Sequence, residues 1–180
     1  MFDLTRSELL GFAKDVSSSV AARKFQKALD ADRDADGGES RNLPRSLPQW
    51  LDLLAELAEQ SPKELHHAFG RRLFERFAIF YPDFIPSNVS ALDFLEGVER
   101  HVHDELRSIY PGARPPRLDC ERLSETRLII RYFSASPAEE LCVGMLEATL
   151  DHFETRATIL RRPPEKGADA VFELVASPDE

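Results

Sequence analysis

Alternating carboxylates between residues 32 and 37 are the first feature that could bind a ligand. The run reads Asp32-x-Asp34-x-Asp36-Gly37, like the first half of a calcium loop, where carboxylates surround the ion and glycine makes the turn. The second half departs from that pattern, because Leu43 stands six residues after Gly37, where a bidentate glutamate is needed. We interpret the run as a solvated acidic loop rather than a calcium site.

The histidines could bind a metal ion or transfer protons, and they are His66, His67, His101, His103 and His152. His101 and His103 are two residues apart, so on a helix they point about 160° from each other. No cysteine stands at zinc-ligand spacing from them, and a chelated zinc site is not expected. His103 falls at the flank of an apolar helix face, where an imidazole can direct a ring nitrogen into a pocket. A half-exposed helix histidine without a ligand is the other interpretation.

Sequence motifs of the common enzyme classes are missing. The chain has no nucleophile-elbow glycine pattern, no phosphate-cradling glycine loop and no dinucleotide fingerprint. A hydrolase that uses His66, His67 or His152 is one hypothesis for the function, but no nucleophile–base pair supports it. No motif therefore supports catalysis.

The length and charge of the chain also restrict its function. Its 180 residues are 42% hydrophobic, which fits one compact domain over 1–180, and the net charge is −9. This acidic balance disfavours nucleic-acid or anionic-membrane binding through a broad basic surface. No apolar run approaches the roughly 20 residues of a membrane span. Cys120 and Cys142 form no disulfide framework and no leader precedes the domain, so we expect a soluble cytoplasmic protein.

Helical periodicity dominates the first 110 residues. Apolar residues recur three or four positions apart, and Ser61-Pro62-Lys63-Glu64 combines a cap, a first-turn proline and a capping-box glutamate. The predicted helices are one or two within 4–29, one from Ser46 through Leu57, one from Ser61 to Phe80 and one from Ser90 to Tyr110, with a loop over 30–48.

Strand alternation begins after Tyr110-Pro111-Gly112. Strands are predicted over 117–120, 127–133, 152–160 and 168–175, with a helix over 137–151. In the second strand Tyr132 and Ser134 share one face, and Arg131 lies on the other. Helices followed by strands predict an α+β fold, in which an N-terminal helical part (about 1–112) packs on a C-terminal four-stranded antiparallel sheet with an inserted helix (about 113–177).

The segment from His103 to Leu118, HDELRSIYPGARPPRL, resembles the proximal segment of heme nitric oxide/oxygen-binding (H-NOX) domains, the sensor fold of soluble guanylate cyclase. The run Tyr132-Phe133-Ser134-Ala135-Ser136 follows at matching spacing and is similar to the family's Tyr-x-Ser-x-Arg heme-propionate motif. The resemblance covers most of the chain, and the first fifty residues are the hardest to align. It implies the H-NOX fold and a heme cofactor.

The resemblance assigns roles to six residues. It implies that His103 is the proximal ligand of a b-type heme iron, that Pro116 presses on the porphyrin, and that Tyr132 and Ser134 hydrogen-bond the propionates. Oxygen-binding members carry a distal tyrosine where this chain has Leu141, and Met145 follows one turn later. An apolar distal wall favours nitric oxide or carbon monoxide over oxygen, because it lacks a hydrogen-bond donor for bound oxygen.

The last position of the propionate motif departs from the family, because Ser136 stands where the family has arginine. A hydrogen bond to a charged group contributes roughly 1.5–3 kcal/mol, so its loss weakens heme binding by about ten- to a hundredfold. Arg114 and Arg117 are candidate substitutes, whereas Arg131 faces the other side of its strand.

The function implied by the resemblance is gas sensing by a regulatory binding protein, and not an enzyme. Nitric oxide would displace His103 from the iron, and the helix that carries His103 would relax into a second state read by a partner. That partner would be a separate protein such as a histidine kinase or a cyclic-di-GMP enzyme. The alternative is a heme-free interaction or ligand-binding module with the H-NOX fold, which Ser136 and the divergent first fifty residues favour.

Overall fold

Helices make up the N-terminal part of the computed structural model, which describes residues 2–35, 45–109 and 114–177. Ser61 caps its helix by accepting a hydrogen bond from Glu64 N, and Ser90 forms a capping box with Asp93. The helices are α1 (Phe2–Val16), α2 (Ser19–Ala35), α3 (Leu47–Ala58), α4 (Pro62–Phe80), the 3₁₀ turn η1 (Pro82–Phe84), α5 (Ala91–Val98), the π turn η2 (Glu99–His103) and α6 (Asp104–Ile109).

A four-stranded sheet and one helix make up the C-terminal part. Neighbouring strands are antiparallel, in the order β1-β2-β4-β3. The α+β fold class predicted from the sequence is therefore confirmed. The elements are β1 (Arg117–Ser124), β2 (Arg127–Phe133), α7 (Glu139–His152), β3 (Ala157–Arg162) and β4 (Ala170–Ala176).

Three predicted boundaries differ from the structure by more than two residues. Helix α2 continues to Ala35, so 30–35 is helical and not a loop, since neither glycine nor proline interrupts that stretch. Strand β1 runs to Ser124 and not to Cys120, because β2 pairs with it along its whole length. Strand β3 begins at Ala157 and not at His152, since α7 extends through His152 and the chain then turns at Glu154, which has a φ of 51°.

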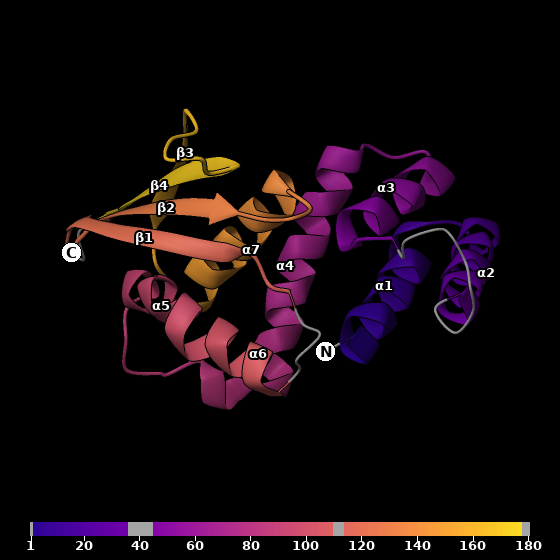
Figure 1. Cartoon of the computed structure of the whole chain (residues 1–180), viewed down its shortest axis with the longest axis horizontal. Helices are drawn as coiled ribbons and strands as arrows, with labels where there is room; N and C mark the ends of the chain where they lie inside the picture. The colour runs from indigo at the N-terminus through magenta and orange to yellow at the C-terminus, as the bar shows by residue number, and fades with distance from the viewer. Residues whose placement is uncertain (1, 36–44, 110–113, 178–180) are drawn as a thin grey trace.

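Helix α4 links the sheet to the first three helices (Figure 1). The figure shows the sheet with α5 and α6 beside it, and α1 to α3 at the other end of the molecule. Phe69 of α4 packs with α1 to α3 in one hydrophobic cluster, and Phe74 packs with α5, α7 and the sheet in another. We call these the helical cluster and the sheet cluster; the first includes Phe12, Phe25, Trp50 and Leu54, and the second includes Leu95, Ile130, Leu146 and Phe172.

Two glycines bring α4 and α7 into backbone contact. A Cβ atom added at Gly70 would collide with the carbonyl oxygen of Leu141, and one added at Gly144 would collide with that of His67. Only glycine permits this approach, because every other residue carries a Cβ atom. The pair is also joined by an ion pair of 2.6 Å between Arg71 and Asp151. This contact fixes the helical part of the chain against the part that carries the sheet.

Replacing Gly144 with alanine should therefore destabilise the protein. We expect Gly144→Ala to lower the free energy of unfolding by about 3 kcal/mol, at the upper end of overpacking costs, because two backbones must separate. The control is Gly11→Ala, where the new Cβ meets only the flexible guanidinium of Arg72, so the change should stay within about 1 kcal/mol. Chemical denaturation followed by circular dichroism measures both. Equal stability of the two variants would show that the α4–α7 contact tolerates a side chain.

Candidate functional site

His103 lies at the end of a π-helical turn. The single helix predicted from Ser90 to Tyr110 is interrupted by η2, where Asp104 N donates to the carbonyl of Glu99, five residues earlier. Such turns are rare and occur often at functional sites. The His103 residue is only 9% exposed, whereas His101 is exposed. His103 is thus more deeply buried than the flank position that the periodicity predicts.

One side of the His103 ring is held by a carboxylate. Nδ1 lies 3.0 Å from Oε2 of Glu99. The same oxygen accepts a hydrogen bond of 3.0 Å from Leu118 N, and the second carboxylate oxygen, Oε1, accepts one of 2.6 Å from Arg107. Within the described part of the chain, Nε2 of His103 has no hydrogen-bond partner, and no fully buried side-chain nitrogen or oxygen is left unpaired. Nε2 is therefore not completely enclosed by the protein.

Burial keeps the imidazole neutral. Burial lowers the pKa of His103, and the hydrogen bond that His103 donates to Glu99 opposes this shift without reversing it. For Glu99, burial acts to raise the pKa, but hydrogen bonds from Leu118, Arg107 and His103 outweigh it and the pKa is lowered. At neutral pH the pair consists of a carboxylate and a neutral imidazole, which is the form that binds metals.

Two hydroxyl groups lie together at the end of β2. Tyr132 is buried and its hydroxyl accepts a hydrogen bond from Ala138 N at 3.2 Å, while Oγ of Ser134 accepts one from Ser136 N at 3.2 Å. Burial raises the pKa of Tyr132, so its hydroxyl keeps the proton and remains a donor.

A cleft of about 510 Å³ opens beside Ser134. Arg107, Arg114 and Arg117 line it, and Arg117 stacks on the Phe133 ring at 3.8 Å. The two arginines considered as substitutes for the missing motif arginine thus lie beside the motif. Residues 110–113, which include the predicted Tyr-Pro-Gly turn, lie outside the described residues.

The opposite face of β2 holds Arg131, as the strand alternation predicted. Its guanidinium binds Glu165 at 2.7 Å and Glu121 at 2.6 Å, away from the Tyr132 hydroxyl. Arg131 therefore does not take the place of the missing arginine. Arg107 was not identified from the sequence, although it lies four residues after His103, at the spacing of neighbours on a helix face.

Glu99 is the second residue that the sequence analysis missed. It lies four residues before His103, so the same helical spacing could have identified it. Its contact with Leu118, however, joins residues that are 19 positions apart in the chain. That contact depends on how β1 packs against η2 and has no local sequence signal.

The other residues with predicted roles lie on different elements. Pro116 is half-buried and directly precedes β1. Leu141 and Met145 are half-buried on α7, and Leu141 packs against the helical cluster. The role of these three residues at a cofactor stays a prediction.

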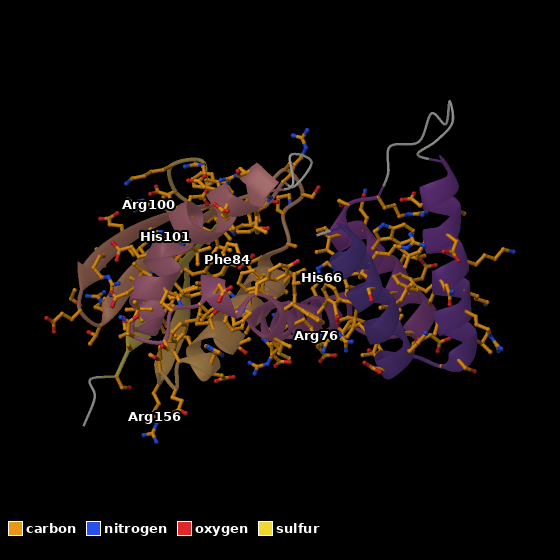
Figure 2. All side chains as sticks on the ribbon, turned by 90° about the horizontal axis from the view of Figure 1, so that it is seen from below. His66, Arg76, Phe84, Arg100, His101 and Arg156 are labelled. Atoms are coloured by element: carbon orange, nitrogen blue, oxygen red, sulfur yellow. The ribbon has the colours of Figure 1, made fainter. Side chains whose placement is uncertain are left out.

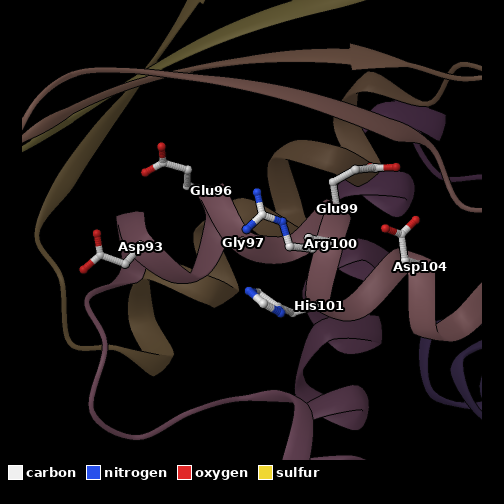
Figure 3. A pocket seen from close by; sticks show the side chains of 7 residues that line it. All are labelled: Asp93, Glu96, Gly97, Glu99, Arg100, His101 and Asp104. Carbon is white, nitrogen blue, oxygen red and sulfur yellow. The ribbon is translucent and has the colours of Figure 1, made fainter.

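Three of the other histidines contact protein side chains. His66 lies 2.9 Å from Asp52 and His67 lies 2.9 Å from Glu147, while His152 packs edge-on against Phe74. Figure 2 shows His66 and Arg76 near the middle of the molecule. His101 lines a different hollow, of about 540 Å³, with Asp93, Glu96, Glu99, Arg100 and Asp104 (Figure 3). Glu99 belongs to this hollow and also contacts the His103 ring, because its Oε2 lies 3.0 Å from Nδ1 of His103.

The acidic run lies partly within a helix, and both cysteines are free thiols. Asp32 and Asp34 lie within helix α2 and not in a loop, while Asp36 and Gly37 fall outside the described residues. Burial raises the pKa of both Cys120 and Cys142 to about 12, so both are thiols at neutral pH and not reactive thiolates.

The sequence profile of the family described as "Haem-NO-binding" matches residues 45–161. The chain belongs to the Haem-NO-binding (H-NOX) family. Members of this family are heme-binding gas-sensor domains and not catalysts themselves. The match contains the whole proximal segment and the propionate motif on which the resemblance was based.

Solved H-NOX structures share the fold of this chain. An unliganded Fe(II) H-NOX protein from K. algicida is 20% identical, with a TM-score of 0.77, over 98% of this chain and 96% of that one. An H-NOX from Shewanella woodyi in the Fe(II)CO state is 22% identical, with a TM-score of 0.70, over 99% and 95%. A mutant from T. Tengcongensis is 15% identical, with a TM-score of 0.69, over 97% and 96%. No curated protein sequence matches the chain.

The donor set around His103 fits a heme. A neutral imidazole with Nδ1 held by the protein and Nε2 unpaired has the chemistry of an axial ligand. The hydroxyls of Tyr132 and Ser134, together with nearby guanidinium groups, are donors of the kind that bind carboxylates. At neutral pH the His103 imidazole is already neutral and the Tyr132 hydroxyl already protonated, so neither needs to change its protonation state.

The buried environment of His103 predicts its titration. In the heme-free protein its imidazole should titrate below the ordinary histidine pKa of about 6.5, because burial disfavours the imidazolium form. A pH titration of the ring nitrogens by ¹H–¹⁵N NMR measures this. A midpoint at or above the ordinary value would mean that Glu99 outweighs burial.

Proposed function

We propose that this chain is a heme-based sensor of nitric oxide, with carbon monoxide as a second ligand, in which His103 binds the iron of a b-type heme. The observation that carries the proposal is the buried, neutral His103 ring, held at Nδ1 by Glu99 and unpaired at Nε2, in a chain of a gas-sensing heme family. When bound, the heme would supply an iron that binds the gas. The chain supplies its ligand, its anchoring groups and its surroundings.

The propionates would be anchored at the end of β2. Tyr132 and Ser134 offer hydroxyl donors there, and Arg114 and Arg117 line the adjoining cleft. Arg114 is exposed, and no ion pair holds it among the described residues. It is therefore the candidate to replace the charge that Ser136 lacks. Pro116, directly before β1, would contact the porphyrin on the His103 side.

The distal wall would be apolar. Leu141 and Met145 offer no hydrogen-bond donor from their side chains. Oxygen as a ligand would gain from a hydrogen-bond donor, whereas nitric oxide would need little, so such a wall would favour nitric oxide. The preference for nitric oxide over oxygen therefore rests on Leu141 and Met145 facing the ligand.

A change at His103 would be transmitted through the contacts of Glu99. This carboxylate joins η2 to α6 through Arg107 and to β1 through Leu118 N. Movement of the His103 ring would thus act on a helix and on a strand at once. A separate signalling protein, such as a histidine kinase or a cyclic-di-GMP enzyme in the cytoplasm, would bind differently to the two states.

None of the helices in the described part of the chain has the length and hydropathy needed to cross a bilayer.

Substitution of His103 tests the proposal. The wild-type protein should bind one equivalent of heme with an absorption band that shifts on addition of nitric oxide. His103→Ala should lose the heme unless free imidazole is supplied, because imidazole can occupy the vacated position. His101→Ala is the matched control, since its side chain lies in a different hollow on the same turn. Heme content equal to wild type in His103→Ala would remove His103 as the ligand.

The missing motif arginine gives a second test. Ser136→Arg should slow heme dissociation by about ten- to a hundredfold, because it restores a charge-assisted contact to a propionate. Arg114→Ala should have the opposite effect, since it removes the charge that we assign to the same role. Transfer of heme to excess apomyoglobin measures both rates. Unchanged rates in both variants would show that neither position contacts the propionates.

A heme-free module is the second candidate function, and one observation favours it. The carboxylate of Asp169 accepts a hydrogen bond of 2.8 Å from Ser134 N and lines the same cleft as the arginines. A negative charge there opposes the binding of a propionate. A folded protein without any saturable heme binding would establish this alternative.

A further inference from the structure

We infer that Glu99 is a positioning residue that acts through His103: its carboxylate fixes which ring nitrogen carries the proton and increases the electron donation of the other nitrogen to iron. This inference rests on the proposed function. It assigns a role to a residue outside the segment that carries the family resemblance, which begins at His103.

Three elements hold the Glu99 carboxylate in place. Glu99 itself lies in η2, Leu118 N of β1 binds Oε2 at 3.0 Å, and Arg107 of α6 binds Oε1 at 2.6 Å. His103 Nδ1 lies 3.0 Å from the oxygen that Leu118 binds. Because both oxygens have other donors, the carboxylate cannot turn away from the ring without losing hydrogen bonds.

The contact determines the tautomer of His103. An ionised carboxylate can only accept hydrogen bonds, so Nδ1 must carry the proton when it is bound to Glu99. The lone pair of the neutral ring then lies on Nε2, which has no partner in the described part of the chain. Outer hydrogen-bond partners of this kind orient a metal-binding histidine and raise its basicity.

Arg107 opposes the effect of Glu99. Its guanidinium shares the carboxylate with His103 and withdraws part of its negative charge from the ring. Removal of Glu99 should therefore weaken electron donation by His103, and removal of Arg107 should strengthen it. A purely structural role predicts the same direction for both variants, because each loses a contact that holds η2.

The first measurement uses the heme-free protein. Ring ¹⁵N chemical shifts should show His103 almost entirely protonated at Nδ1 in the wild type. In Glu99→Gln both tautomers should be populated, because an amide can donate as well as accept. Glu96→Gln is the matched control, since Glu96 lies one turn earlier and binds Arg122 at 2.9 Å instead of His103. A wild-type ring protonated mainly at Nε2 would overturn the inference.

The second measurement uses the heme-reconstituted protein without gas. In Glu99→Gln the preference for ferric over ferrous heme should fall by about tenfold, which raises the midpoint potential by about 59 mV for a one-electron couple. The iron–histidine stretching frequency in the resonance Raman spectrum should fall as well. Arg107→Gln should shift both quantities the opposite way, and Glu96→Gln should shift neither.

The outcomes separate this inference from the proposed function. Heme binding with wild-type potentials in Glu99→Gln, or changes of the same sign in Glu99→Gln and Arg107→Gln, would overturn the role of Glu99 and leave the sensor standing. Absence of heme binding in the wild type would overturn the sensor, and with it any electron donation to iron. Opposite shifts in the two variants would establish the inference.

Discussion

The backbone contact between α4 and α7 holds the two hydrophobic clusters in one arrangement. Gly70 and Gly144 let the helices meet at backbone distance, and Phe69 and Phe74 of α4 then enter different clusters. A side chain at either glycine would have to separate the helices and would move the helical cluster relative to the sheet. The position of every residue on α1 to α3 relative to His103 therefore depends on this contact.

The second constraint lies within the site. Glu99 joins the π turn, α6 and β1 through three hydrogen bonds, so the ring of His103 is fixed to the sheet as well as to its own helix. A partly buried carboxylate is stable there because its oxygens are paired with donors. The same arrangement that satisfies Glu99 leaves Nε2 of His103 available. The hydrogen bonds of Glu99 thus hold three elements together and also determine which nitrogen of His103 is left for a ligand.

Local signals predicted most elements correctly. The caps at Ser61 and Ser90 mark helix starts that the structure confirms, and the alternation in 127–133 identified β2 with the observed ends. Predicted element ends were wrong where strand pairing or a turn sets them. Strand β1 is longer than predicted because β2 pairs with it along its length, and β3 starts later because α7 extends through His152. The resemblance identified the family, which the match over 45–161 confirms, and its assignment of residues to a heme stays a prediction.

The sequence by itself determined the fold class, the order of the elements and the candidate role of His103, because periodicity, caps and short motifs depend on residues close together in the chain. Only the tertiary structure revealed the π turn, the glycine contact and the partners of Glu99. The bond from Leu118 to Glu99 joins residues 19 positions apart, and the contact between Gly70 and Leu141 joins two separate helices. Such contacts form only when the elements pack, so no local pattern in the chain encodes them.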